Sequence, residues 1–350
     1  MAAGSIAIAT PRALAADAGK RFDWLVVGAT AWLLGGLYAD GWAHGYNLPD
    51  SFWTVWHLIF YSGFSVFAAV VLGATALRRA SAPTWRSAVP QGYLGSVIGA
   101  ATFAVGGIAD TAWHTAFGVE VGNDILLSPS HLLLALGIFL LVSGPVLADL
   151  SRRDQSTRLV DRLPMVLALT GVFSLLTFMT LYAGPYSGLL GAKGSSLRND
   201  TVFRGLLGMF LFSAFVSGVL LFAIRRTNLP FGSVTILLGV NGLAMIVMQG
   251  HAPLETQLTI IAAAIGAGLI GDVLLRALRP SATRVVPMRV FAAAVPATFF
   301  VLYFIAIFVL AGWGWTFTFV SGSVVLCGLV GLLLSFTGTP LGPRATMDDA

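Results

Sequence analysis

The chain has 350 residues, of which 57% are hydrophobic and only 10% are charged, and its mean hydropathy is +0.86. Charged residues make up about a quarter of an ordinary soluble domain, so this composition excludes a soluble enzyme and a nucleic-acid-binding protein. The single cysteine, Cys327, excludes an intrachain disulfide and a zinc site built from several cysteines. The sequence therefore predicts an integral membrane protein.

Ten segments are predicted to cross the lipid bilayer as helices, because each holds about 20 mostly apolar residues. In chain order they cover residues 24–45, 52–77, 92–114, 128–149, 163–183, 203–224, 230–250, 255–278, 288–312 and 314–336. The predicted fold class is all-α, a polytopic transmembrane bundle of about ten helices. We expect cytoplasmic tails at residues 1–22 and 338–350, a four-helix region at 23–150 and a six-helix bundle at 151–337.

The distribution of basic residues predicts which side of the membrane each loop faces, because short cytoplasmic loops retain Lys and Arg. With a cytoplasmic amino terminus, all of the 20 Lys and Arg residues except Lys193, Arg198 and Arg204 fall on the cytoplasmic side. We therefore expect a protein of the plasma or inner membrane with both termini in the cytoplasm. The net charge of +5 reflects this topology, so the expected partner is the lipid bilayer and not a nucleic acid.

Two helical hairpins in the N-terminal part form a tandem parallel repeat. An Asp and a His near the end of the first helix recur 70 residues later, and a His in the following helix recurs 74 residues later. The repeated residues are Asp40, His44 and His57 in the first hairpin and Asp110, His114 and His131 in the second. An Asp and a His four residues apart lie on one face of a helix, about 6 Å apart along its axis. We expect the third residue to join them at the outer membrane boundary.

Each of these clusters has two interpretations. An intramembrane carboxylate is costly unless it has a partner, so its presence suggests a function. A carboxylate with two neutral imidazoles is a good ligand set for copper, zinc or non-haem iron. Alternatively, the Asp holds the His in one tautomer, as a buried pair that stabilises the hairpin or passes protons. The duplication favours metal binding, and the sequence leaves open whether the two metals share one site.

The clusters resemble the copper site in the C subunit of the copper-dependent membrane monooxygenases, the particulate methane and ammonia monooxygenase family. That site has an Asp, three residues, a His, twelve residues and a second His. Residues 110–114 and 129–131 resemble its local sequence, although sixteen residues separate these two histidines, and Asp40, His44 and His57 match its spacing. The resemblance is confined to the third and fourth predicted helices and a few neighbours. It implies that these residues are copper ligands, at or beside a site where O2 is activated to oxidise a small apolar substrate.

The same residues are compatible with other functions. The sequence does not identify a catalytic residue for any of them. With zinc, an outward-facing hydrolase would use a metal-bound water. A transporter would need ionisable groups at several depths, and the inner halves of the predicted helices carry few of them. A non-catalytic subunit would use the six helices after residue 150 to pack against other membrane subunits.

Three further groups of polar residues are interpreted as structural contacts near the membrane boundaries. They are Asp272 with Arg276, Asp149 with Arg152 and Arg153, and His251 with Glu255. In the last group Pro253 interrupts the helical spacing, which favours a cap or a surface contact over metal ligation.

Overall fold

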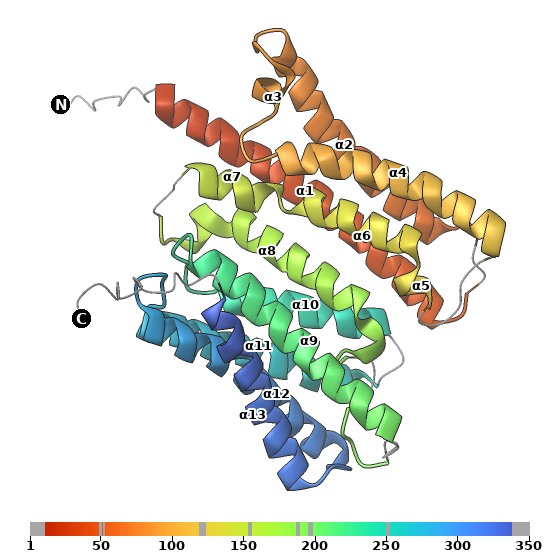
Figure 1. The fold of residues 1–350 in the computed structure, drawn as a ribbon, viewed down its shortest axis with the longest axis vertical. Coiled ribbons are helices and arrows are strands. Elements are labelled where there is room, and N and C mark those ends of the chain that lie inside the picture. The colour runs from red at the N-terminus through yellow and green to blue at the C-terminus, as the bar shows by residue number, and fades with distance from the viewer. Residues whose placement is uncertain are drawn as a thin grey trace, which may run out of the picture. The chain divides into compact units, whose positions relative to one another are not determined.

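A computed structural model describes residues 11–48, 51, 53–118, 124–152, 156–186, 190–194, 199–249 and 253–337. Within these ranges every regular element is a helix (Figure 1). The long elements are α1 (Pro11–Gly45), α2 (Val55–Arg79), α4 (Leu94–Phe117), α6 (Pro129–Val142) with α7 (Gly144–Arg152), α8 (Leu159–Met179), α9 (Asn199–Ile224), α11 (Leu254–Leu278), α12 (Val285–Ala311) and α13 (Phe317–Phe336). The shorter ones are α3 (Trp85–Ala88), α5 (Asp124–Leu127), η1 (Leu181–Ala183) and α10 (Ser233–Gln249).

The described residues contain nine helices that are long and apolar enough to cross a membrane. The most apolar 18-residue stretches of these helices have mean hydropathies between 1.3 and 2.4. The segment predicted at 230–250 forms α10, which has only 17 residues and is therefore shorter than a usual span. Large apolar side chains such as Leu25, Leu77 and Ile108 are more than half exposed on these helices. Lipid covers such surfaces in a membrane protein. The prediction of an all-α polytopic membrane bundle is confirmed.

Two predicted segments differ in detail from the observed helices. Helix α1 begins at Pro11, inside the segment expected to be a tail, because proline suits the first turn of a helix and alanine favours its continuation. The segment predicted at 128–149 is divided into α6 and α7 at Ser143. Pro145 has no N–H to donate to the carbonyl of Leu141, and this carbonyl instead accepts a hydrogen bond from Ser96 at 2.9 Å.

The chain folds as two compact units, and the first comprises residues 1–179 with 247–250. Here α1 packs along α2 and α4 packs along α6, so the two repeated sequences form two helical hairpins. Helix α8 packs against α1, α6 and α7. The described residues of this unit therefore contain five helices long enough to span the membrane, one more than the four-helix region expected at residues 23–150.

Glycines allow the two helices of each hairpin to approach closely. A Cβ atom on Gly36 would lie 2.4 Å from the Cα of Phe60 in α2, and one on Gly63 would lie 2.7 Å from the Cα of Leu33 in α1. In the second hairpin a Cβ on Gly106 would lie 3.0 Å from the side chain of Leu134. One on Gly137, the counterpart of Gly63, would lie 2.8 Å from the backbone N of Phe103, the counterpart of Leu33. The repeat therefore extends from the sequence to the helix–helix contact, with small residues at the interface as is usual in membranes.

The second unit comprises residues 180–246 and 251–350. Helix α12 packs along α11 and α13, and α9 packs against α12 and α13 around stacked aromatic rings such as Phe212 and Phe299. Asp272 was expected to pair with Arg276, but its carboxylate instead accepts hydrogen bonds from Val234 N at 3.1 Å and from Thr235 N at 2.9 Å. It therefore caps the free backbone donors in the first turn of α10.

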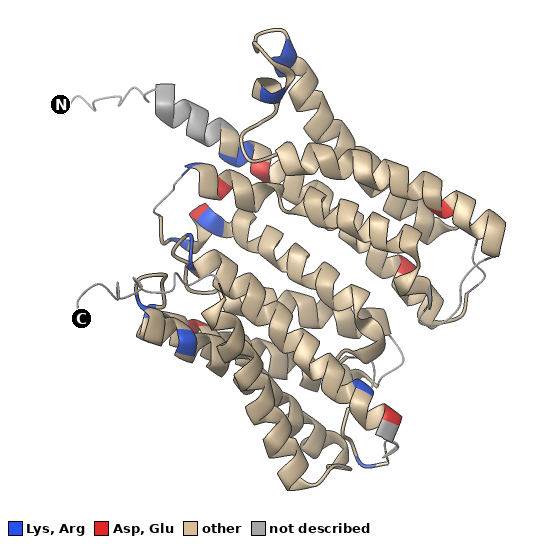
Figure 2. Ribbon diagram, viewed as in Figure 1, with Lys and Arg blue, Asp and Glu red and all other residues tan. Residues whose placement is uncertain are grey.

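Charged side chains lie near the ends of the helices in each unit, and the helix bodies are almost free of them (Figure 2). Among the described residues of the first unit, two Arg–Asp ion pairs join different helices. Asp149 pairs at 2.8 Å with Arg162 from α8, and Arg152 pairs with Asp23 from α1. The expected contact between Asp149 and Arg152 is therefore replaced by contacts between helices, whereas Arg153 lies outside the described residues.

Tyr93 completes the second ion pair, because its hydroxyl donates to Asp23 at 2.6 Å. Burial raises the pKa of the Tyr93 phenol well above its ordinary value, so this group keeps its proton at neutral pH.

Candidate metal centres

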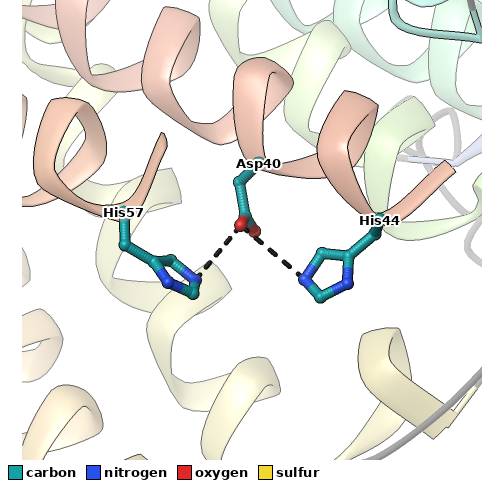
Figure 3. Close-up of side chains that lie close together, drawn as sticks. All are labelled: Asp40, His44 and His57. Carbon is teal, nitrogen blue, oxygen red and sulfur yellow. Dashed lines mark ion pairs between the residues drawn. The ribbon is translucent and has the colours of Figure 1, made fainter. Parts of the chain in front are cut away.

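Asp40, His44 and His57 form one cluster in the first hairpin (Figure 3). Asp40 and His44 stand one turn apart at the end of α1, and His57 enters from the first turn of α2. The Asp40 Oδ1 atom lies 3.6 Å from His44 Nε2 and 3.1 Å from His57 Nε2. Each residue presents one ligand atom to the others, and all three atoms lie within 4.8 Å of one another.

Asp110, His114 and His131 form the corresponding cluster in the second hairpin. Asp110 Oδ2 lies 3.4 Å from His114 Nε2, and Asp110 Oδ1 lies 3.4 Å from His131 Nε2. The six predicted ligands therefore come together as two groups of three, each made by one hairpin. Their side chains are between 10% and 26% exposed, so a small cation could reach them.

The start of the second helix in each hairpin positions its histidine. Thr54 precedes α2 and Ser128 precedes α6, and each lies three residues before the histidine. Thr54 Oγ1 lies 3.0 Å from His57 Nδ1, and Ser128 Oγ lies 2.7 Å from His131 Nδ1. Ser128 also accepts from the backbone N of His131 at 3.3 Å as a helix cap, and Pro129 occupies the first turn. Both rings are held at Nδ1, so Nε2 faces the aspartate.

Hydrogen-bond acceptors establish which ring nitrogen carries the proton in two of the histidines. His57 Nδ1 lies 2.7 Å from the carbonyl oxygen of Ser51, and His114 Nδ1 lies 3.3 Å from that of Gly118. A carbonyl oxygen can only accept, so we infer that Nδ1 is protonated in both rings. In the neutral form of either ring, Nε2 is then an unprotonated acceptor.

This tautomer brings acceptors face to face. The bare Nε2 of His57 lies 3.1 Å from Asp40 Oδ1, and that of His114 lies 3.4 Å from Asp110 Oδ2. The Oδ1 atoms of Asp40 and Asp110 are both buried, and neither accepts a hydrogen bond from any described residue. A buried acceptor without a donor is unfavourable, and a cation between the carboxylate and the imidazoles would remove this cost.

The distances suit a metal ion in that place. Four ligands about 2.0–2.1 Å from a tetrahedral ion lie about 3.3–3.4 Å from one another. The four measured Nε2–carboxylate distances range from 3.1 to 3.6 Å. At metal sites the histidine nitrogen that does not bind the metal usually donates to a carbonyl or another acceptor. The hydroxyl and carbonyl groups that contact Nδ1 in these clusters are of that kind.

The sequence identified all six residues of the clusters but not all of the groups that orient them. The hydroxyl residue three positions before His57 and His131 recurs in both hairpins, and Ser128 was recognisable as a helix cap. The carbonyls of Ser51 and Gly118 carry no sequence signal, because any residue has a carbonyl and only the turn geometry brings it to the ring.

His251 lies outside the described residues, whereas Glu255 is exposed in the first turn of α11. Comparisons of the chain with protein-family models, with curated proteins and with solved structures find no match. The resemblance to the C subunit of the copper-dependent membrane monooxygenases therefore rests on the local residue pattern alone.

Proposed function

We propose that this integral membrane protein binds two transition-metal ions, one at each Asp-His-His cluster, on the extracytoplasmic side of the membrane. The observation that carries the proposal is that His57 and His114 each turn Nδ1 to a carbonyl oxygen and Nε2 to an aspartate, which makes Nε2 an acceptor in the neutral ring. A metal ion satisfies the carboxylate and both imidazoles of a cluster together. A proton on one imidazole would satisfy only one of the two contacts.

Copper is the metal that we favour, and zinc is the alternative. Two imidazoles and one carboxylate suit copper, zinc and non-haem iron, so the donor set alone does not separate them. The local likeness of residues 110–114 and 129–131 to a copper site favours copper. Three protein ligands also leave a coordination position open for water or a substrate, which is the arrangement of catalytic zinc sites.

The proposed activity depends on the metal. With copper, the resemblance implies O2 activation and the oxidation of a small apolar substrate, which would dissolve in the surrounding lipid. With zinc, the bound water would have a pKa lowered to about 7 and could hydrolyse a substrate at the membrane surface. In both cases this chain's residues hold and orient the metal, with Asp40 and Asp110 offsetting its charge.

Elemental analysis of the purified protein tests metal binding. We expect two equivalents of metal in the wild type, one in a His44→Ala/His57→Ala variant and one in a His114→Ala/His131→Ala variant. His251→Ala is the matched control, because it removes a histidine that lies outside both repeated sequences. Cu(II) electron paramagnetic resonance then distinguishes copper from zinc. Wild-type protein that remains free of metal after incubation with copper and with zinc would refute the proposal, and the clusters would then be protonated ion pairs.

A second measurement tests the activity. Membranes containing copper-loaded wild type should consume O2 when a small apolar substrate is added, and the His114→Ala/His131→Ala variant should not. Metal binding without O2 consumption, together with partner chains that co-purify, would support a non-catalytic subunit instead.

A further inference from the structure

A cavity of about 140 Å³ lies at one end of the second unit. Its wall is formed by the end of α9, from Gly218 to Arg226, and by Leu334 and Thr337 at the end of α13. Both helices are long enough to span the membrane, so the cavity lies at a membrane boundary. It therefore combines an apolar side formed by Leu221 and Leu334 with a cationic side formed by Arg225 and Arg226.

Contacts with the surrounding helices hold the arginines in place. Arg225 donates from Nη2 to the carbonyl of Ser335 at 2.8 Å. Arg226 donates to the carbonyl of Phe222 at 3.3 Å, and its guanidinium lies 4.1 Å from the centre of the Phe222 ring. Arg289, from the first turn of α12, lies in the same way 4.0 Å over the ring of Phe336. Arg225 and Arg289 therefore contact adjacent residues of α13, whereas only Arg225 and Arg226 line the cavity.

No carboxylate among the described residues neutralises these three arginines. In the first unit, by contrast, Arg152 and Arg162 each pair with an aspartate. The Nε atoms of Arg225 and Arg289 are buried and have no hydrogen-bond partner within the described part of the chain. Burial, together with the neighbouring charge of Arg226, lowers the pKa of Arg225. The two arginines that line the cavity, Arg225 and Arg226, therefore bring positive charge that no described carboxylate neutralises, and Arg225 also has an unused N–H donor.

We propose that this cavity binds the phosphate of an anionic phospholipid headgroup. Guanidinium groups form strong, charge-assisted hydrogen bonds with phosphate oxygens, and basic pockets between membrane helices are suited to anionic headgroups. The helix carbonyls nearby would repel an anion, but Arg225 and Arg226 already cover those of Ser335 and Phe222. The charge distribution of the loops places this end of the unit on the cytoplasmic side, where anionic lipids are abundant.

Native mass spectrometry of the full chain in neutral detergent tests the proposal. The protein is titrated with equal amounts of phosphatidylglycerol and phosphatidylcholine, and the bound lipids are counted. We expect the wild type to prefer phosphatidylglycerol. An Arg225→Gln/Arg226→Gln variant should lose about tenfold or more in affinity for it, because hydrogen bonds to charged groups are lost. Arg226→Gln alone keeps the Arg225–Ser335 contact, so it is the variant that retains the fold, and about a fivefold loss is expected.

Arg78→Gln/Arg79→Gln is the matched control. These arginines are also adjacent at the end of a spanning helix, but they are exposed and do not line this cavity. If both double variants lose the same affinity for phosphatidylglycerol, general surface charge explains the binding and the proposal is overturned. Displacement of the lipid by millimolar inorganic phosphate, with no lipid preference left, would show a site for free anions. If a chain that ends at Thr337 binds the lipid but the full chain does not, residues 338–350 occupy the cavity in the full chain. Displacement by free phosphate and occupancy by residues 338–350 would each overturn the proposal.

Discussion

Ser128→Ala should weaken metal binding in the second hairpin much more than Thr54→Ala weakens it in the first. Ser128 Oγ lies 2.7 Å from His131 Nδ1 and is its only hydrogen-bond partner among the described residues. Thr54 Oγ1 lies 3.0 Å from His57 Nδ1, but the carbonyl of Ser51 lies even closer to the same atom, at 2.7 Å. Loss of the threonine hydroxyl therefore leaves the His57 ring anchored, and loss of the serine hydroxyl releases the His131 ring.

The expected magnitudes follow from these contacts. Removal of a hydrogen-bond partner behind a metal ligand lowers metal affinity about 10–100-fold, and this range applies to Ser128→Ala. The same change removes a helix cap, which should lower the free energy of unfolding by about 1 kcal/mol. Thr54 makes no side-chain cap bond. Its replacement should lower metal affinity less than about fivefold, because one net hydrogen bond contributes about 1 kcal/mol and the carbonyl contact remains.

Competition with a chromophoric chelator measures each site separately. Ser128→Ala is made in a chain whose first site is removed by His44→Ala/His57→Ala, and Thr54→Ala in one whose second site is removed by His114→Ala/His131→Ala. Ser128→Thr keeps a hydroxyl at the cap position and serves as the control, with affinity close to that of the wild type. An unchanged affinity in Ser128→Ala, or equal losses in both hairpins, would refute the role assigned to these hydroxyls.

Three further predictions concern stability, measured by unfolding the detergent-solubilised protein with increasing SDS. Gly36→Ala should lower the free energy of unfolding by about 1–3 kcal/mol, because its Cβ would lie 2.4 Å from the backbone of α2. Gly35→Ala is the control: its Cβ would enter open space, so the change should be neutral or slightly stabilising. Arg162→Met should cost about 3–5 kcal/mol by removing the guanidinium that pairs with the buried carboxylate of Asp149, and adding Asp149→Leu should recover most of the loss. Asp272→Ala should cost at least about 2 kcal/mol, since two backbone donors at the start of α10 lose their acceptor; a loss no larger than that of an exposed aspartate would contradict the capping role.

The sequence predicted the fold class and the two clusters because both depend on short-range regularities. A stretch of apolar residues is enough to predict a spanning helix, and a spacing of four residues is enough to place Asp40 beside His44 on one helical face. The third ligand in each hairpin followed from the antiparallel return of the chain. The shortness of α10 and the break at Ser143 required knowledge of where individual backbone hydrogen bonds form.

Partners of buried charges were harder to predict, because sequence neighbours compete with residues from other helices. Asp149 has Arg152 and Arg153 close by in the chain, yet it pairs with Arg162 from α8. Asp272 has Arg276 one turn away, yet it caps α10. In both cases the carboxylate faces the packed interior, where a partner from another helix is nearest. The spacing of charges along one helix cannot show which face is buried.

The comparison of the two hairpins within this chain helps to separate metal binding from a purely structural role. Glycines at the helix crossing recur, and they allow the close contact of the two helices without any ionisable residue. The aspartate, both histidines and the hydroxyl before the second helix recur as well, with Nε2 facing the carboxylate in all four rings. A structural Asp–His contact needs one imidazole that donates to the carboxylate. Each cluster here has two imidazoles for one carboxylate, and a carbonyl holds Nδ1 of His57 and of His114. The Nε2 atoms and the carboxylate oxygens of a cluster therefore face one another as acceptors, which is the arrangement that suits a bound cation.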